Sequence, residues 1–352
     1  MKKERVLYLD LIRVIGFLVI TAYHFASAVG ANGIEAAHID LYVGFNSFRW
    51  GPIALACFFM VSGAALIMNY EEKLDIKEFY KKRFLGIFPL FWLAYLFAFL
   101  VYFYRMKGMP EAPKITFLFT IIGMDKYMEE FMCTFGLVGE WFMGAIIILY
   151  LLFPLYRFIM LKNKYILPVI LLGATLFLSY NNVFPLNFDK NPIVCSMYFV
   201  IGMLLEMLRK GKNQKAVVIG RRIAAAVGVG VYIVVYMVER VNHSINSYHR
   251  IFILALSFYM VMMEVSTWIR SERAKRLIVV LGRHSYAFYL IHHVFLQSYI
   301  PHFAGRDMSG SNTLVLFLTS VGYIYLLALG LEKIYGRLAE WICRERLVTR
   351  SK

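Results

Sequence analysis

The sequence predicts an all-α fold: a polytopic integral membrane bundle of about ten transmembrane helices with both termini in the cytoplasm. Three observations lead to this prediction. Of the 352 residues, 60% are hydrophobic and only 17% are charged, and the mean hydropathy is +0.63. Soluble domains are nearer to about half apolar and about a quarter charged. Long apolar runs recur along the chain, and Lys and Arg gather in alternate segments between them.

Runs of about 20 apolar residues, the length needed to cross a bilayer, define the spans in order. They lie near residues 7–28, 51–70, 84–104, 138–158, 164–181, 193–208, 216–237, 251–269, 277–299 and 313–334. The sixth is short, and the apolar segment 114–122 suits a re-entrant or interfacial piece. We expect residues 1–334 to form a single transmembrane domain and residues 335–352 a basic cytoplasmic tail.

The distribution of basic residues tests this order. Assigned alternately from a cytoplasmic N-terminus, the inner segments carry 27 Lys and Arg and the outer segments 9. Cytoplasmic loops carry such an excess, which predicts a multi-pass protein of the cell membrane. The net charge of +16 therefore requires no nucleic-acid partner, and the basic C-terminal segment suits anionic lipid. Although MKKER before an apolar run resembles a signal peptide, Asp10 and Arg13 interrupt that run, and we expect the first span to be retained.

The first span contains three ionisable residues, Asp10, Arg13 and His24. Eleven residues separate Arg13 from His24, which is close to three full helical turns, so both project from one face about 16 Å apart. Asp10 precedes Arg13 by three residues, a spacing at which the two side chains can pair. Charged groups within a membrane usually mark a pathway or a site. The alternative is a neutralised Asp10–Arg13 pair and a histidine that extends to the outer headgroups.

Further segments accompany this Arg-x10-His pattern. They are FFMVSGAAL (Phe58 to Leu66), FYKKRFLGIFPLFW (Phe79 to Trp92), EWFMGAIIILYLLFPL (Glu140 to Leu155) and LGRHSYAFYLIHH (Leu281 to His293). In this order they resemble the signature of membrane acyltransferase family 3, the surface-polysaccharide O-acyltransferases. The resemblance implies transfer of an acyl group, most simply acetyl, from acyl-CoA (the donor, acetyl-CoA) to a glycan or lipid-linked sugar acceptor. One position departs from the pattern: Gly86 stands where the family's R-x-x-R segment has its second arginine.

Acyl transfer to a hydroxyl needs a general base near the alcohol. His24 is the histidine of the first span, and an imidazole pKa of about 6.5 suits that role at neutral pH. His292 and Glu140 lie at a comparable outer depth on the predicted topology, and would either orient His24 or remain interfacial polar groups. His293 must point about 100° away from His292 on a helix, so the two cannot face one site equally.

The inner end of the bundle offers basic residues for the donor's phosphates. Arg83, Lys82 and Arg13 suit a polyanionic nucleotide such as coenzyme A, with Asp10 holding Arg13. Ordinary positive-inside charge also explains Lys82, but not Arg13 within a span. Ser62, next to Gly63, is a candidate donor contact, although small residues often serve helix packing.

Two other classes of function stay open. A multi-pass transporter or exporter of a glycan or small solute would also use a polar stripe of Asp10, Arg13 and His24. A catalytically inactive scaffold gains some support from Gly86. The four cysteines show no metal-ligand spacing, so we expect no metal. The acceptor is unassigned, and we expect outer loops 29–50 and 105–137 to select it. The oligomeric state is also open, with a homo-oligomer as one form.

Overall fold

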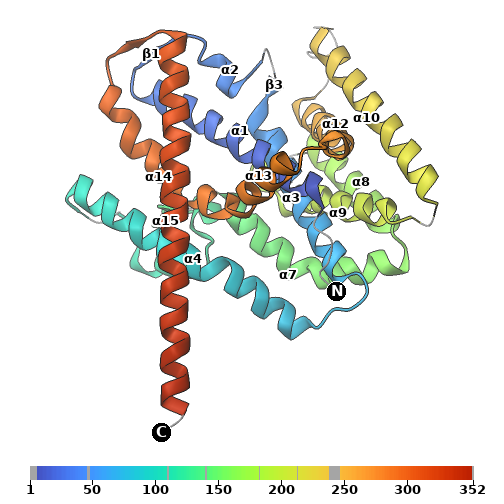
Figure 1. Ribbon diagram of the computed structural model, residues 1–352, viewed down its shortest axis with the longest axis horizontal. Coiled ribbons are helices and arrows are strands. Elements are labelled where there is room, and N and C mark those ends of the chain that lie inside the picture. The colour runs from blue at the N-terminus through green and yellow to red at the C-terminus, as the bar shows by residue number, and fades with distance from the viewer. Residues whose placement is uncertain are drawn as a thin grey trace. The chain divides into compact units, whose positions relative to one another are not determined.

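The computed structural model describes residues 6–45, 48–108, 111–138, 141–181, 183–211, 213–237 and 246–350, and it is almost entirely helical (Figure 1). The longer helices are α1 (Leu7–Ala31), α3 (Trp50–Tyr70), α4 (Ile76–Met106), α7 (Trp141–Lys162), α8 (Ile166–Tyr180), α9 (Pro192–Arg209), α10 (Gln214–Met237), α12 (Ser247–Trp268), α13 (Glu272–Arg283), α14 (Ser285–Tyr299) and α15 (Gly310–Arg350). The short ones are α2 (Asp40–Val43), α5 (Phe117–Ile121), α6 (Asp125–Met128), and the 3-10 turns η1 (Lys114–Thr116), η2 (Phe188–Lys190) and η3 (Ile300–Phe303).

The helices are long and apolar enough to make the chain a multi-pass membrane protein. Within the described ranges, eight of them qualify as membrane spans by length and hydropathy: α1, α3, α4, α7, α9, α10, α12 and α15. Helix α8 is apolar but has only 15 residues. The all-α class predicted from the sequence is therefore confirmed, whereas the number ten is not. Helix α15 also continues without a break from its span through the predicted tail to Arg350.

The span predicted near 277–299 is divided in the structure. Helix α13 ends at Arg283 and α14 begins at Ser285, with His284 in a turn between them. Nδ1 of His284 lies 2.5 Å from a carboxylate oxygen of Glu332 on α15, so the residue at the break has its own partner. Hydropathy averaged over a long window cannot detect a one-residue break that has apolar residues on both sides.

The chain divides into two compact units, each described here by itself. Unit 1 draws on residues up to Tyr23, on Asp40–Ile76 and on Ala145–Arg283. It contains the first part of α1, with α3, α8, α9, α10, α12 and α13, and most of α7. Its strands β2 (Gly44–Phe45) and β3 (Phe48–Arg49) form a two-residue antiparallel ladder before α3.

Helices α3 and α9 pack with their backbones almost in contact. A Cβ added to Gly63 of α3 would lie 1.9 Å from the carbonyl oxygen of Phe199, and one added to Gly202 of α9 would lie 1.9 Å from that of Met60. Such an approach is open only to glycine, as in the small-residue interfaces of membrane helices. Around this contact unit 1 buries large side chains, among them Phe59 and Phe199.

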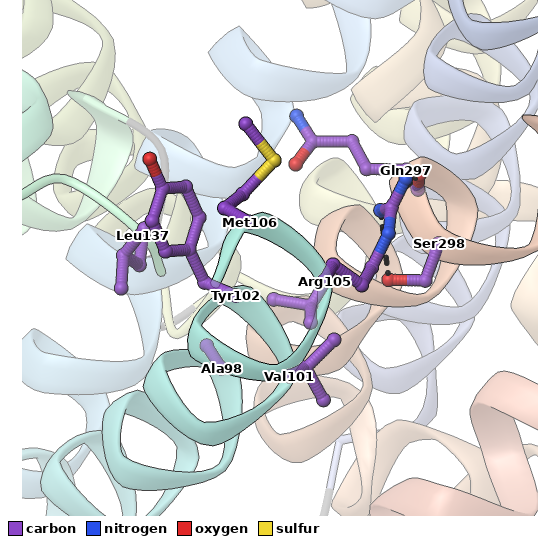
Figure 2. A pocket seen from close by; sticks show the side chains of 9 residues that line it. Ala98, Val101, Tyr102, Arg105, Met106, Leu137, Gln297 and Ser298 are labelled. Atoms are coloured by element: carbon purple, nitrogen blue, oxygen red, sulfur yellow. Dashed lines mark hydrogen bonds between the residues drawn. The ribbon is translucent and has the colours of Figure 1, made fainter. Parts of the chain in front are cut away.

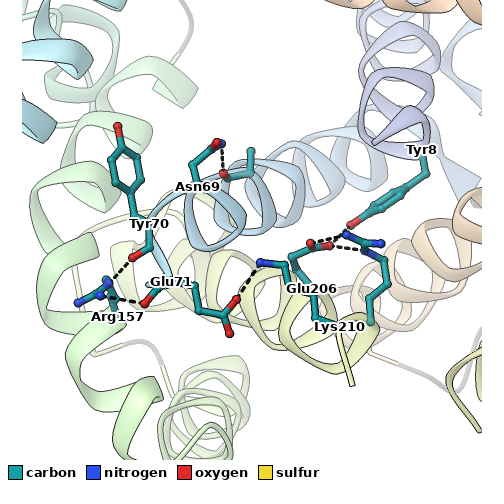
Figure 3. Close-up of polar contacts among 9 residues, drawn as sticks. Tyr8, Asn69, Tyr70, Glu71, Arg157, Glu206 and Lys210 are labelled. Atoms are coloured by element: carbon teal, nitrogen blue, oxygen red, sulfur yellow. Dashed lines mark hydrogen bonds and ion pairs between the residues drawn. The ribbon is translucent and has the colours of Figure 1, made fainter. Parts of the chain in front are cut away.

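Polar contacts join the ends of several helices of unit 1 (Figure 3). Arg157 of α7 donates from Nε and Nη2 to the carbonyl oxygens of Tyr70 and Glu71, just where α3 ends. Glu206 of α9 is fully buried and accepts from Arg209 through both carboxylate oxygens, and Tyr8 of α1 donates to it at 3.0 Å. A buried carboxylate is tolerated when it is paired and hydrogen-bonded in this way.

Unit 2 comprises His24–Ile39, Lys77–Gly144 and the chain from His284 onward. Helices α14 and α15 pack together as an antiparallel pair joined by a short connection (Figure 1). Strand β1 (Glu35–Ala36), which follows α1, pairs in parallel with β4 (Asp307–Met308), which precedes α15. This ladder fixes the end of α1 to the α14–α15 connection, and so sets the last turns of α1 against α14.

Candidate active site

Helix α1 carries the three ionisable residues found in the sequence. In unit 1, Nη1 of Arg13 donates to Oδ1 of Asp10 at 2.9 Å, which confirms the predicted pair. Asp10 is 1% exposed and Arg13 is 30% exposed. Gly282 of α13 lies against this carboxylate, because a Cβ there would be 3.0 Å from Oδ1 of Asp10. Asp10 is therefore buried under α13 and holds the arginine that sits beside it.

His24 lies three turns further along α1, in unit 2, where it meets two histidines of α14. Its Nδ1 is 2.9 Å from Nε2 of His293. The ring centroid of His24 is 4.3 Å from that of His293 and 5.2 Å from that of His292. The His292 side chain is buried, and those of His24 and His293 are partly buried. The structure thus brings three imidazoles together, although His24 and His293 are 269 positions apart in the chain.

Hydrogen bonds join Gln297, His293 and His24 in a chain, and the orientation of the Gln297 amide decides which nitrogen of His24 is basic. Nε2 of Gln297, one turn later on α14, lies 3.2 Å from Nδ1 of His293. In this orientation the amide donates to His293, and Nε2 of His293 donates to Nδ1 of His24. If the amide is turned so that its oxygen faces His293, both donations reverse, and Nε2 of His24 carries the lone pair.

The structure shows a hydrogen bond between His24 and the second of the two α14 histidines, His293. His292 was one of two residues, with Glu140, predicted either to orient His24 or to remain an interfacial polar group, and its Nδ1 donates to the backbone oxygen of Tyr289 at 2.5 Å. His293, which we expected to point away, makes the hydrogen bond. Two residues that diverge by about 100° can both approach a third side chain when that side chain lies between them. Neither His293 nor Gln297 could be selected from spacing within one helix.

The three histidines could hold a divalent cation. One ring nitrogen from each lies within 4.8 Å of the others. Zn²⁺ binds three protein nitrogens and keeps a fourth position open in catalytic sites. The Nδ1–H of His292 donates to a carbonyl oxygen, as metal-ligating histidines commonly do. No ligand spacing in the sequence indicated this, because the three residues come from two distant helices.

Added Zn²⁺ is therefore expected to inhibit an activity that depends on His24. If His24 is the base predicted from the sequence, binding would occupy its lone pair and should lower turnover by about 10²-fold, within the range that a general base contributes. Acyl transfer would be assayed with Zn²⁺, with Mg²⁺, which prefers oxygen ligands, and after addition of EDTA. His293→Gln should weaken the Zn²⁺ inhibition. Equal inhibition of wild type and His293→Gln would place the zinc elsewhere.

Arg83, Lys82 and Gly86 lie on α4 in unit 2. The Arg83 guanidinium carbon is 5.9 Å from the centre of the Phe79 ring, one turn earlier, and the side chain is partly buried. Lys82 is exposed and 3.5 Å from Glu78, so it behaves as a surface residue. Gly86 is exposed, and a Cβ added there would meet no atom within 4 Å. Steric exclusion therefore does not explain the missing second arginine.

The remaining candidates have different surroundings. Ser62 precedes Gly63 on α3 and is partly buried. Its neighbour forms the close contact with α9, so a packing role is confirmed for Gly63, and the donor contact of Ser62 stays a prediction. Glu140 lies outside the described residues, and the next residue, Trp141, begins α7.

The segment after α4 folds back onto that helix within unit 2. Nε1 of Trp92 donates to the carbonyl oxygen of Ile121 at 2.9 Å, and the hydroxyl of Tyr95 donates to that of Phe135 at 2.8 Å. Asp125, in α6, is 2% exposed, and burial raises the pKa of its carboxyl to about 6. The segment that we expect to contact the acceptor is thus fixed to α4 and carries a carboxyl group that titrates near neutrality.

Comparison with known proteins agrees with this arrangement. The chain matches the family model of acyltransferase family 3, described as an acyltransferase domain, over residues 6–333. The comparisons with curated proteins and with solved structures found no match. The matched range runs from the start of α1 into α15, so it includes the Asp10–Arg13 pair, the α4 basic segment and the histidine cluster. The chain belongs to membrane acyltransferase family 3.

Proposed function

We propose that this acyltransferase moves an acyl group, acetyl in the simplest case, from cytosolic acyl-CoA to a hydroxyl of a cell-surface polysaccharide, a glycolipid or a lipid-linked glycan precursor. The proposal places both termini in the cytoplasm of a cell whose membrane the helices cross, in keeping with the excess of basic residues in the inner segments. The observation that supports it best is the 2.9 Å hydrogen bond between His24 and His293, which holds the imidazole that we propose as the base.

The chemistry follows from that hydrogen bond. Nε2 of His24 takes the proton of the acceptor hydroxyl while its oxygen bonds to the carbonyl carbon of the thioester. The carbon–sulfur bond then breaks, and the imidazolium returns the proton to the departing coenzyme A sulfur. With the amide oxygen of Gln297 turned towards it, His293 accepts from Nδ1 of His24 and keeps His24 in the required tautomer, the role of the orienting residue in a nucleophile–base–orienter set.

Donor recognition is assigned to arginine side chains. Arg83 and Arg13 are the candidates for the phosphates of coenzyme A, because a guanidinium presents several N–H groups to phosphate oxygens. Asp10 restrains Arg13 through the 2.9 Å ion pair. The two arginines belong to different units. Lys82, exposed and near Glu78, is assigned a minor role.

Titration of the purified protein in nanodiscs with acetyl-CoA tests the proposal. We expect saturable binding that Arg83→Ala weakens about tenfold or more, since a hydrogen bond to a charged group contributes about 1.5–3 kcal/mol. Gly86→Arg should tighten binding, because it adds a second guanidinium one turn from Arg83 where there is open space. Lys77→Ala is the matched control, since Lys77 is an exposed lysine near the start of α4, and it should bind like wild type.

Two outcomes would oppose the proposal. If the wild-type protein shows no saturable binding of acetyl-CoA, the transporter interpretation of the Asp10, Arg13 and His24 stripe becomes the better one. If acetyl groups from labelled acetyl-CoA appear only on cytosolic acceptors of sealed vesicles, transfer to surface glycans is wrong even though the enzyme is an acyltransferase.

A further inference from the structure

A pocket of about 210 Å³ lies between the ends of α4 and α14 in unit 2. Tyr102, Arg105 and Met106 of α4 line it, Leu137 comes from the segment before α7, and Gln297 and Ser298 come from α14 (Figure 2). The volume is below the roughly 300–1,000 Å³ of sites for drug-sized ligands. It has room for one sugar residue and not for an oligosaccharide.

A single charged side chain, Arg105, lies among the described residues that line this pocket. Its Nη1 donates to the carbonyl oxygen of Gln297 at 2.8 Å and approaches Oγ of Ser298 at 3.4 Å (Figure 2). Within the described part of the chain these bonds use Nη1 alone, so Nε and Nη2 keep N–H groups for a ligand. The side chain is exposed, and the bond to Gln297 restrains it, so the guanidinium can present a fork to a carboxylate or phosphate at a reduced entropic cost.

The rest of the pocket is amphipathic, as a sugar ring is. The Tyr102 ring and the apolar surfaces of Met106 and Leu137 can cover the C–H face of a pyranose, while Gln297 and Ser298 offer hydrogen bonds to its hydroxyl groups. A nucleotide would need more volume and more positive charge than this pocket has. A lipid tail would make no hydrogen bond with the remaining N–H groups of Arg105 or with the hydroxyl of Ser298.

Gln297 connects the pocket to the histidine cluster. Its backbone oxygen accepts from Arg105, and its side-chain amide is 3.2 Å from Nδ1 of His293. His293 in turn is hydrogen-bonded to His24. A molecule in the pocket would therefore contact a residue that is only one hydrogen bond away from the partner of the proposed base.

We propose that this pocket is the acceptor subsite and that it selects a glycan residue carrying an anionic group, a carboxylate or a phosphate, which Arg105 binds. The inference rests on the proposed function, because it is the acyl acceptor that must lie close to His24. It assigns specificity to Arg105 and Tyr102, residues of α4 that lie outside the segments that first indicated the family.

Ligand-observed NMR on the protein in nanodiscs tests the assignment with methyl β-D-glucuronide, methyl β-D-glucoside and glucose 6-phosphate. We expect the glucuronide or the phosphate to bind about tenfold or more tightly than the neutral glucoside, as a charge-assisted bidentate pair allows. Tighter binding of the glucuronide would indicate a carboxylate on the acceptor, and tighter binding of glucose 6-phosphate would indicate a phosphate. Arg105→Gln should abolish the preference, and Tyr102→Ala should weaken both charged and neutral ligands.

Lys107→Gln is the matched control, since Lys107 is exposed at the same end of α4 and lies over the Tyr104 ring rather than in the pocket. If Arg105→Gln and Lys107→Gln reduce anion binding equally, general surface charge is responsible and the subsite is wrong. Equal binding of glucuronide, phosphate and glucoside by the wild type also overturns it. Acetyl-CoA binding, measured on the same samples, reports separately on the proposed function and should be unchanged in Arg105→Gln.

Discussion

Replacing His24 with glutamine is expected to lower the rate of acyl transfer by about 10²- to 10⁴-fold, the contribution of a well-placed general base, while acetyl-CoA binds as before. Glutamine retains polarity and approximate size but cannot accept and return the proton. Nδ1 of the imidazole lies 2.9 Å from Nε2 of His293. The change therefore removes the proposed base and leaves the other two histidines in place.

The measurement is single-turnover transfer from labelled acetyl-CoA to a glycan acceptor, with donor binding determined on the same preparation. His302→Gln is the matched control, because His302 is an exposed histidine of the same unit whose Nδ1 is 3.1 Å from the backbone oxygen of Tyr299. It should transfer at the wild-type rate. A His24→Gln variant that transfers normally would show that another group removes the proton.

His293→Gln distinguishes a positioning residue from the base. Loss of the bond that fixes the tautomer of His24 should lower the rate less than His24→Gln does, and should change the pH profile of transfer. A merely structural role for His293 would lower the amount of folded protein and leave the pH profile unchanged.

The sequence contained the local part of this site but not its assembly. The 11-residue interval between Arg13 and His24 and the three-residue interval between Asp10 and Arg13 are properties of one helix, and the predicted Asp10–Arg13 pair is present. The meeting of His24 with His293 depends on the rotation and depth of α14 relative to the end of α1. The period of a single helix does not determine those quantities.

The same distinction applies to the fold. Composition and apolar runs were sufficient for a multi-pass helical protein, since the bilayer imposes length and hydropathy on each span. The turn at His284 was missed, because its stability comes partly from Glu332, 48 residues away. The buried Glu206 accepts a hydrogen bond from Tyr8, which lies 198 residues earlier. Long-range partners of this kind leave no periodic signal.

Gly202→Ala is expected to be one of the most destabilising single-methyl changes in unit 1. The added Cβ would lie 1.9 Å from the carbonyl oxygen of Met60, and that oxygen belongs to the backbone of α3. A side chain could rotate away, but here the two helices must separate. Overpacking commonly lowers the free energy of unfolding by about 1–3 kcal/mol and sometimes more. Because the neighbouring atom is backbone, we expect a loss of about 3 kcal/mol or more here. Gly63→Ala meets the oxygen of Phe199 at the same distance and should behave alike.

The thermal midpoint of the detergent-solubilised protein, followed by size-exclusion chromatography, measures this effect. Gly173→Ala on α8 is the matched control, because a Cβ there meets nothing within 4 Å, and alanine favours the helix by about 1 kcal/mol over glycine. It should melt at or slightly above the wild-type temperature.

The double variant Gly63→Ala/Gly202→Ala should be destabilised by less than the sum of the single changes, since the first methyl already separates the helices at the shared contact. Wild-type melting of Gly202→Ala would contradict the close approach of α3 and α9. Additive losses would mean that the two glycines act at independent contacts. That result would contradict the structure, in which Gly202 faces Met60 and Gly63 faces Phe199 between the same two helices.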